Sequence, residues 1–125
     1  MPTVLLVADD DWIRHDVEAA LAESTTRVHT VTNPRAVVTE AYEAGPDLYV
    51  VDMQVGSMGG MAVTRAIKDA VGQGILRAAP IVLLLDRSAD VFLGRRAGAD
   101  AWVQKPFTAQ ELRAARDAAS AGVAG

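Results

Sequence analysis

The chain has 125 residues, half of them hydrophobic and 22% charged, with a formal net charge of -4 at pH 7. These values indicate one folded domain and argue against a nucleic-acid-binding surface, because no basic block offsets the acidic balance. With no cysteine and no apolar run long enough to cross a membrane, we expect a protein of the reducing cytoplasm that has no disulfide, cysteine-bound metal or membrane partner.

The first half of the chain alternates strand and helix patterns. Residues 4–8 form a short apolar run, typical of a buried strand, and a helical pattern follows from about 11 to 23. Polar and apolar residues alternate over 27–31, which predicts an edge strand. Asn33 and Pro34 then suit the cap and the first residue of a helix that continues to about residue 44.

A second buried strand is predicted at 48–52, where an apolar run ends on the single carboxylate of Asp52. A glycine-rich loop over 55–60 leads to a helix over about 61–71. Residues 80–85 predict the fourth strand.

The last part of the chain predicts a helix, a strand and a helix. Asp86 or Ser88 would cap a short helix that continues through Arg96, and residues 101–104 predict the fifth strand. Thr108 and Glu111 have the spacing of a capping box at the start of the final helix.

Strand and helix patterns alternate five times, which predicts an α/β fold with a doubly wound parallel sheet. The flavodoxin-like (βα)5 arrangement with strand order 2-1-3-4-5 suits five such units and one edge-like second strand. We expect the domain to span residues 1–121, with residues 122–125 as a frayed tail rich in small residues.

Charged side chains follow three of the predicted strands. Asp9 and Asp10 follow the first strand, Asp52 ends the third and Lys105 follows the fifth, so all four should meet at one edge of the sheet. Grouped carboxylates favour Mg²⁺, and an Asp beside the metal can accept a phosphoryl group. Position alone therefore proposes Asp52 as the acceptor, Asp9 and Asp10 as metal ligands and Lys105 as the counter-charge. Taken alone, the Asp run suits a helix cap equally well.

Four motifs together resemble the receiver domain of two-component response regulators, over essentially the whole chain. They are residues 4–10, residues 46–52, residues 58–60 and residues 98–107. The resemblance implies phosphotransfer to Asp52 from a histidine kinase or phosphotransfer protein. It also implies Mg²⁺ bound by acids after the first strand, by Asp52 and by the main-chain carbonyl of Gln54, and a cis bond before Pro106. The acid pair has two alignments, Ala8 with Asp9 or Asp9 with Asp10.

The chain departs from the family pattern at its expected switch residues. Leu85 stands where the family usually has Thr or Ser, and Asp86 where a small residue is usual. Leu85 cannot donate a hydrogen bond to a phosphoryl group, and Asp86 would either repel that group or bind the metal from another side. Trp102 takes the place of the aromatic switch residue. We therefore expect an atypical receiver whose hydroxyl-and-aromatic relay is broken.

We expect a stand-alone receiver that signals by protein contact, as a monomer or weak homodimer. Val91, Phe92 and Leu93 are consecutive apolar residues of a short helix, so at least one should face outward. With Trp102 and the pair Arg95 and Arg96, they could form an aromatic and arginine-rich contact surface. Core packing of two of the three apolar residues, beside a solvated arginine pair, is an equally good interpretation.

Two other functions compete with the phosphoacceptor. A pseudo-receiver, acting as an interaction module without phosphorylation, is favoured by Ala8, Leu85 and Asp86. A phosphatase of the aspartyl-phosphate type is disfavoured, because Gln54 stands where a second Asp would act as acid and base. We expect no enzymatic activity beyond phosphoryl transfer to Asp52 and its hydrolysis there.

Overall fold

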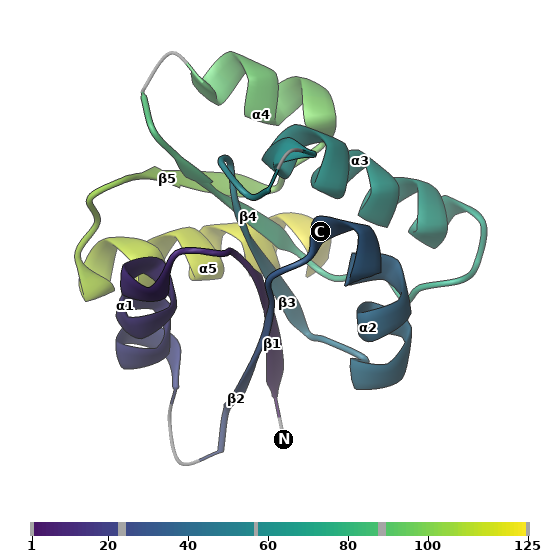
Figure 1. Cartoon of the computed structure of the whole chain (residues 1–125), viewed down its shortest axis with the longest axis horizontal. Helices are drawn as coiled ribbons and strands as arrows, with labels where there is room; N and C mark the ends of the chain where they lie inside the picture. The colour runs from purple at the N-terminus through teal and green to yellow at the C-terminus, as the bar shows by residue number, and fades with distance from the viewer. Residues whose placement is uncertain (1, 23–24, 57, 88–89, 125) are drawn as a thin grey trace.

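The computed structural model describes residues 2–22, 25–56, 58–87 and 90–124. Strands and helices alternate along the chain, with one short 3-10 turn, η1, ahead of the second helix (Figure 1). The strands are β1 (Thr3–Val7), β2 (Arg27–Val31), β3 (Leu48–Asp52), β4 (Ile81–Leu85) and β5 (Ala101–Gln104). The helical segments are α1 (Asp11–Leu21), η1 (Pro34–Ala36), α2 (Val37–Ala44), α3 (Gly59–Gly72), α4 (Val91–Ala97) and α5 (Ala109–Ala124).

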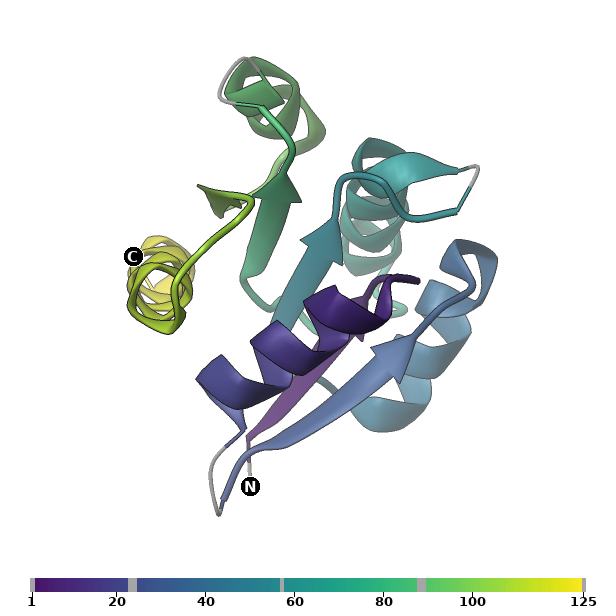
Figure 2. The ribbon, with the colours of Figure 1, turned by 60° about the vertical axis from the view of Figure 1, so that its left-hand side comes forward.

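The five strands form one parallel sheet in the order β2-β1-β3-β4-β5. Every neighbouring pair is parallel, as the arrows of β2, β3 and β4 in Figure 2 show, so the carboxyl ends of all strands meet at one edge. This arrangement confirms the predicted flavodoxin-like fold and strand order. β3 and β4 are central and every residue in them is buried, as their unbroken apolar runs predicted.

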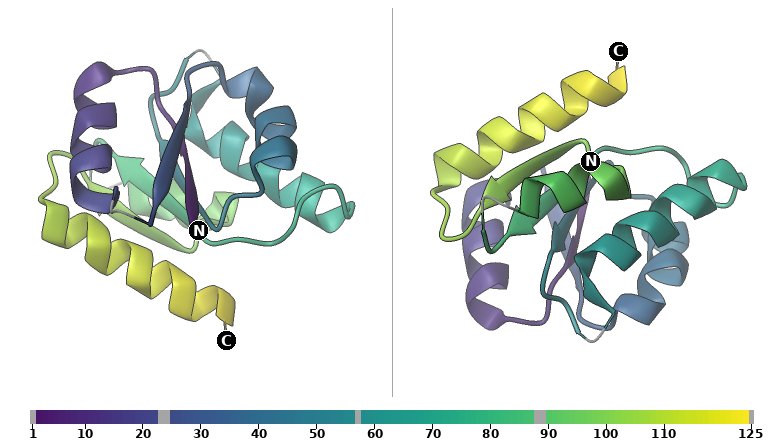
Figure 3. Two further views of the ribbon diagram at one scale, coloured as in Figure 1. Left: turned by 90° about the horizontal axis from the view of Figure 1, so that it is seen from below. Right: turned by 90° about the horizontal axis from the view of Figure 1, so that it is seen from above.

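Helices cover both faces of the sheet (Figure 3). On one face, α1 and α5 bury residues such as Ile13, Leu21 and Leu112 against the sheet. On the other, α2 and α3 bury Val37 and Ile67 in a second core. No helix in the described part of the chain is both long and apolar enough to cross a membrane.

Several predicted boundaries move by a few residues. α4 begins at Val91 with Asp90 at its N-cap, so the expected cap at Asp86 is wrong, and Ser88 lies outside the described residues. The carboxylate of Asp90 instead accepts a hydrogen bond from the Arg87 backbone N–H. α5 continues to Ala124, so no helix end marks the expected boundary at residue 121, and the division of the chain there stays a prediction.

Two predicted helix starts have the expected hydrogen bonds. Thr108 and Glu111 each accept a bond from the other's backbone N–H, which confirms the capping box. Asn33 accepts a bond from the Arg35 N–H, although the turn that begins at Pro34 is 3-10 and α2 proper starts at Val37.

The first turn of α3 lies against the end of β3 because Gly60 has no side chain. A Cβ atom at this position would lie 2.6 Å from the backbone oxygen of Asp52 and 2.8 Å from Cα of Met53. Backbone atoms cannot swing aside as a flexible side chain can, so any larger residue must push α3 away from β3. Gly60 therefore fixes the distance between α3 and the strand that carries Asp52.

We predict that Gly60→Ala lowers the free energy of unfolding by about 2 kcal/mol, because the added methyl group overpacks the contact. Gly72→Ala in the same helix is the matched control, because a Cβ there meets no atom within 4 Å. That change should be neutral or stabilise the protein by up to about 1 kcal/mol, since alanine has the better helix propensity. Urea denaturation of both variants checks the prediction, and equal effects would refute it.

Candidate functional site

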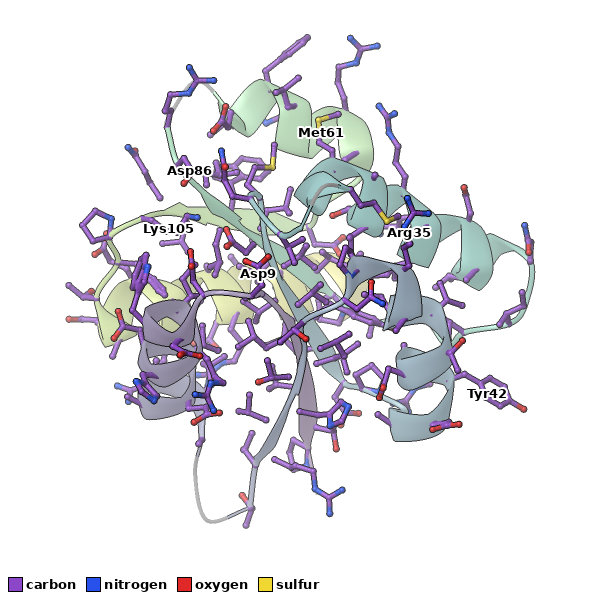
Figure 4. All side chains as sticks on the ribbon, in the orientation of Figure 1. Asp9, Arg35, Tyr42, Met61, Asp86 and Lys105 are labelled. Carbon is purple, nitrogen blue, oxygen red and sulfur yellow. The ribbon has the colours of Figure 1, made fainter. Side chains whose placement is uncertain are left out.

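The charged residues predicted to gather at one edge of the sheet do so. Asp9 and Asp10 lie between β1 and α1, Asp52 is the last residue of β3, and Lys105 directly follows β5. Asp86, in the same position after β4, joins them. Figure 4 shows Asp9, Asp86 and Lys105 at the same end of the sheet, although they come from three separate loops.

Lys105 connects two of these carboxylates. Its Nζ atom donates a hydrogen bond to Oδ1 of Asp52 at 2.5 Å and lies 3.0 Å from Oδ1 of Asp86. The side chain of Asp52 is fully buried, that of Lys105 is 9% exposed and that of Asp86 is 34% exposed. Since a buried charge is costly unless it is paired, Lys105 is the group that permits a carboxylate at the end of β3.

The ammonium of Lys105 is held in its charged form. Burial alone would lower the pKa of this group, but hydrogen bonds and negative charge from Asp52 and Asp86 outweigh burial and raise the pKa above its ordinary value. The side chain is therefore positively charged at neutral pH and can attract an anion.

Three carboxylates form a group with the dimensions of a metal site. One oxygen each from Asp9, Asp10 and Asp52 lie within 4.8 Å of one another. Oδ2 of Asp52 is buried and has no hydrogen-bond partner among the described residues, so it is left with an unmet need for a cation or a donor. These residues fit a hard cation such as Mg²⁺, which binds through one or two carboxylates and keeps several waters.

The structure decides between the competing interpretations of Asp9 and Asp10. Ala8 is buried in the core between the sheet and α1, so it is Asp9 and Asp10 that lie beside Asp52. Asp10 occupies the N-cap position of α1, but within the described residues its side chain makes no capping hydrogen bond. Helix capping therefore does not account for the side-chain position of Asp10.

The loop after β3 contributes a contact that the sequence did not reveal. The backbone N–H of Gly56 donates a hydrogen bond to Oδ2 of Asp9 at 2.9 Å, with Gly56 at φ 53°, a left-handed conformation that favours glycine. The glycine-rich composition of the loop was the available signal. Gln54 donates its N–H to Oδ1 of Asp52 at 3.2 Å. The role of the Gln54 carbonyl as a metal ligand stays a prediction.

Two of the expected switch residues, Leu85 and Trp102, lie in the same core on one face of the sheet. Leu85 is buried in the core under α2 and α3, and Trp102 packs as a half-buried side chain against the same core. Leu85 thus fills its position with an apolar side chain where a hydroxyl was expected from the family pattern. The peptide bond between Lys105 and Pro106 is cis.

An apolar and arginine-rich surface covers α4 and the neighbouring part of β5. Phe92 is 65% exposed and Leu93 is 37% exposed. The guanidinium of Arg96 lies 5.7 Å from the ring centre of Phe92, and that of Arg95 lies 5.1 Å from the ring centre of Trp102. Both pairs are within the range of cation–π attraction, so each arginine can stabilise the ring beside it.

A parallel α/β sheet with this acidic edge and a lysine after the fifth strand defines a receiver-type signalling domain. Residues 4–117 match the response regulator receiver domain family, and the chain belongs to that family. The resemblance inferred from the four sequence motifs is thereby confirmed.

Three relatives illustrate the similarity. The transcriptional regulatory protein AfsQ1 of Streptomyces coelicolor is 34% identical over 91% of this chain and 49% of its own length. The DNA-binding response regulator MtrA of Mycolicibacterium paratuberculosis is 32% identical over 86% of this chain and 47% of its own. The chain therefore spans about half the length of these curated relatives. The structure of the chemotaxis protein CheY4 of Vibrio cholerae superposes on this chain with a TM-score of 0.81 and 26% sequence identity. The match includes 95% of this chain and 98% of the CheY4 chain.

We predict that Lys105→Met lowers the free energy of unfolding by about 3 kcal/mol, because it leaves the buried Asp52 carboxylate unpaired. The double variant Lys105→Met with Asp52→Asn should regain part of this loss. Mg²⁺ should stabilise the single variant more than the double variant, since only the single variant keeps the carboxylate. Denaturant unfolding with and without Mg²⁺ measures all of these effects.

Lys68→Met is the matched control for this prediction. Lys68 lies 3.7 Å from Asp100 in a pair that is partly open to solvent, and its loss should cost less than about 1 kcal/mol. A loss at Lys105 no larger than the loss at Lys68 would contradict the proposed role of the buried pair.

Proposed function

We propose that this receiver domain accepts a phosphoryl group on Asp52 from a phosphohistidine of a histidine kinase or phosphotransfer protein. The observation that carries the proposal is the buried Asp52 carboxylate beside Asp9 and Asp10. One of its oxygens is bonded to Lys105, and the other has no hydrogen-bond partner among the described residues. This pocket provides a nucleophile, a cation for the phosphoryl oxygens and carboxylates for a metal.

The transfer is a substitution at phosphorus. An oxygen of Asp52 forms the new bond to phosphorus while the bond between phosphorus and the donor imidazole nitrogen breaks. The electron pair of the broken bond stays on the imidazole, which takes up a proton from solvent. Lys105 stabilises the charge on the phosphoryl oxygens, and the Gln54 N–H helps to orient the Asp52 carboxylate.

Asp9, Asp10 and Asp52 would hold Mg²⁺, together with the backbone carbonyl of Gln54. The bound ion would neutralise part of the negative charge that accumulates when a phosphoryl group approaches these acids. The contact between Asp9 and the Gly56 N–H supports this role, because it fixes the direction of the Asp9 carboxylate.

For output, we propose protein contact through the surface formed by Phe92, Leu93 and Trp102 with Arg95 and Arg96. Phe92 is exposed and Trp102 is half-buried, and each ring lies beside an arginine, which is the composition of interface centres. The partner would be a downstream protein or a second copy of the domain in a weak dimer.

We predict that incubation with acetyl phosphate and Mg²⁺ adds one phosphoryl group, as measured by intact-protein mass spectrometry. Asp52→Asn should abolish the adduct, and removal of Mg²⁺ by a chelator should reduce it strongly. Asp117 is an exposed carboxylate on α5, and Asp117→Asn is the matched control. This variant should gain the phosphoryl group to the same extent as the wild type. An adduct that persists in Asp52→Asn would place the acceptor elsewhere, and no adduct in any protein would favour the pseudo-receiver.

A second candidate is an acceptor that has lost the usual readout of phosphorylation. Leu85 favours it, because this buried apolar residue offers no hydroxyl that could move toward a phosphoryl group. Leu85 and Trp102 also pack in the same core, so a change of side chain at Leu85 can alter the packing around Trp102. In this form of the proposal Asp52 is modified but Trp102 does not respond.

This relay is tested in a Trp12→Phe background, where Trp102 is the single tryptophan and is excited selectively over the two tyrosines. We predict that the phosphoryl analogue beryllofluoride leaves the Trp102 emission spectrum unchanged while it binds. Adding Leu85→Thr should make the emission respond, because a hydroxyl can follow the analogue and the smaller side chain opens space. A clear spectral shift without Leu85→Thr would show that the relay is intact.

A further inference from the structure

Asp86 contributes a fourth carboxylate to the pocket, from the position directly after β4. Its Oδ1 lies 3.0 Å from Nζ of Lys105, while its Oδ2 is buried and has no hydrogen-bond partner among the described residues. The side chain therefore points into the charged edge of the sheet, where Figure 4 also shows Asp9 and Lys105. Asp86 therefore adds a negative charge to the pocket, and the described residues add no second cation to balance it.

Lys105 is shared between two acids. An ammonium has three donors, and in this structure one reaches Asp52 while another faces Asp86. With the side chain only 9% exposed, little of the ammonium remains open to a new ligand. A phosphoryl group that binds Lys105 must therefore displace the carboxylate of Asp86 or share the ammonium with it.

The net charge of the pocket also opposes the binding of a phosphoryl group. Asp52 and Asp86 share the ammonium of Lys105, and Asp9 and Asp10 lie beside Asp52. The described part of the pocket therefore holds four carboxylates and one ammonium, an excess of negative charge. Like charges a few ångströms apart repel, and burial strengthens the repulsion. The same excess attracts a divalent cation. Removing one carboxylate should therefore affect anions and cations in opposite ways.

We propose that Asp86 is an internal competitor for Lys105, which weakens the binding of a phosphoryl group beside Asp52 and strengthens the binding of a divalent cation. The inference rests on the proposed function, because it takes Asp52 as the acceptor. Asp86 acts through Lys105 and through charge and is thus a positioning residue. With Asp86 present, phosphoryl binding depends more strongly on the divalent cation than it would with Asp9, Asp10 and Asp52 alone.

Asp86→Asn tests the proposal, because it keeps the size of the side chain and one acceptor oxygen while removing the charge. Beryllofluoride affinity is measured by fluorine NMR at saturating Mg²⁺, and Mg²⁺ affinity is measured separately by calorimetry. From the Coulomb repulsion removed, we expect about tenfold tighter analogue binding and about threefold weaker Mg²⁺ binding. Asp86→Ala, which also removes the oxygen that holds Lys105, should change both affinities in the same directions. Asp117→Asn should change neither.

The outcomes separate this inference from the proposed function. A merely structural role of Asp86 would weaken both affinities together, and such a result, or no change in either, would overturn the inference. If the wild type binds the analogue and neither Asp86 variant binds it more tightly, the acceptor function stands and the competitor role is wrong. If no protein binds the analogue at saturating Mg²⁺, the acceptor function is wrong and the inference fails with it.

Discussion

The contact between Lys105 and Asp52 is the interaction on which the pocket depends. A fully buried carboxylate at the end of a central strand is stable only with a partner, and that partner comes from 53 residues further along the chain. The sheet makes the contact possible. The backbone N–H of Lys105 bonds to the carbonyl of Leu85, so the end of β5 is tied to the end of β4, which itself pairs with β3.

The contact between Lys105 and Asp52 therefore depends on the strand order. β3 and β5 flank β4, and parallel strands bring their carboxyl ends to one edge, so charges on three loops can share a pocket. Gly60 adds a second constraint, because it lets α3 lie against the backbone of Asp52. The position of the Asp52 carboxylate is thus fixed both by its strand and by the helix that follows.

Much of this arrangement could be predicted from the sequence. Five apolar runs with helical patterns between them led to the fold, and the residues that end the runs led to Asp9, Asp10, Asp52 and Lys105 as neighbours. Such inferences succeed because strand burial and parallel topology follow from local patterns. The start of α4 was predicted less well, because three acidic or hydroxyl residues precede that helix and any of them suits a cap.

Contacts that depend on the path of a loop could not be predicted from the sequence. The choice between Ala8 and Asp10 as partner of Asp9 depends on where β1 ends and how the chain turns into α1, and the spacing alone fits both alignments. Likewise, the bond from Gly56 to Asp9 spans 47 residues and depends on one left-handed glycine. For Asp86, two effects were compatible with the sequence, and only the geometry shows that its carboxylate faces Lys105.

Leu85 and Asp86 are consecutive departures from the family pattern, yet they act on different parts of the molecule. The side chain of Leu85 enters the core beneath α2 and α3, where Trp102 also packs, whereas the Asp86 carboxylate meets Lys105. Along an extended chain, successive side chains point to opposite sides, which accounts for this division. Under the proposed function, the change at Leu85 would affect how a modified Asp52 is sensed, and the change at Asp86 would affect how readily the pocket binds a phosphoryl group. Because neither effect requires the other, acceptance and readout would then be separate properties of this domain, and loss of one would not imply loss of the other.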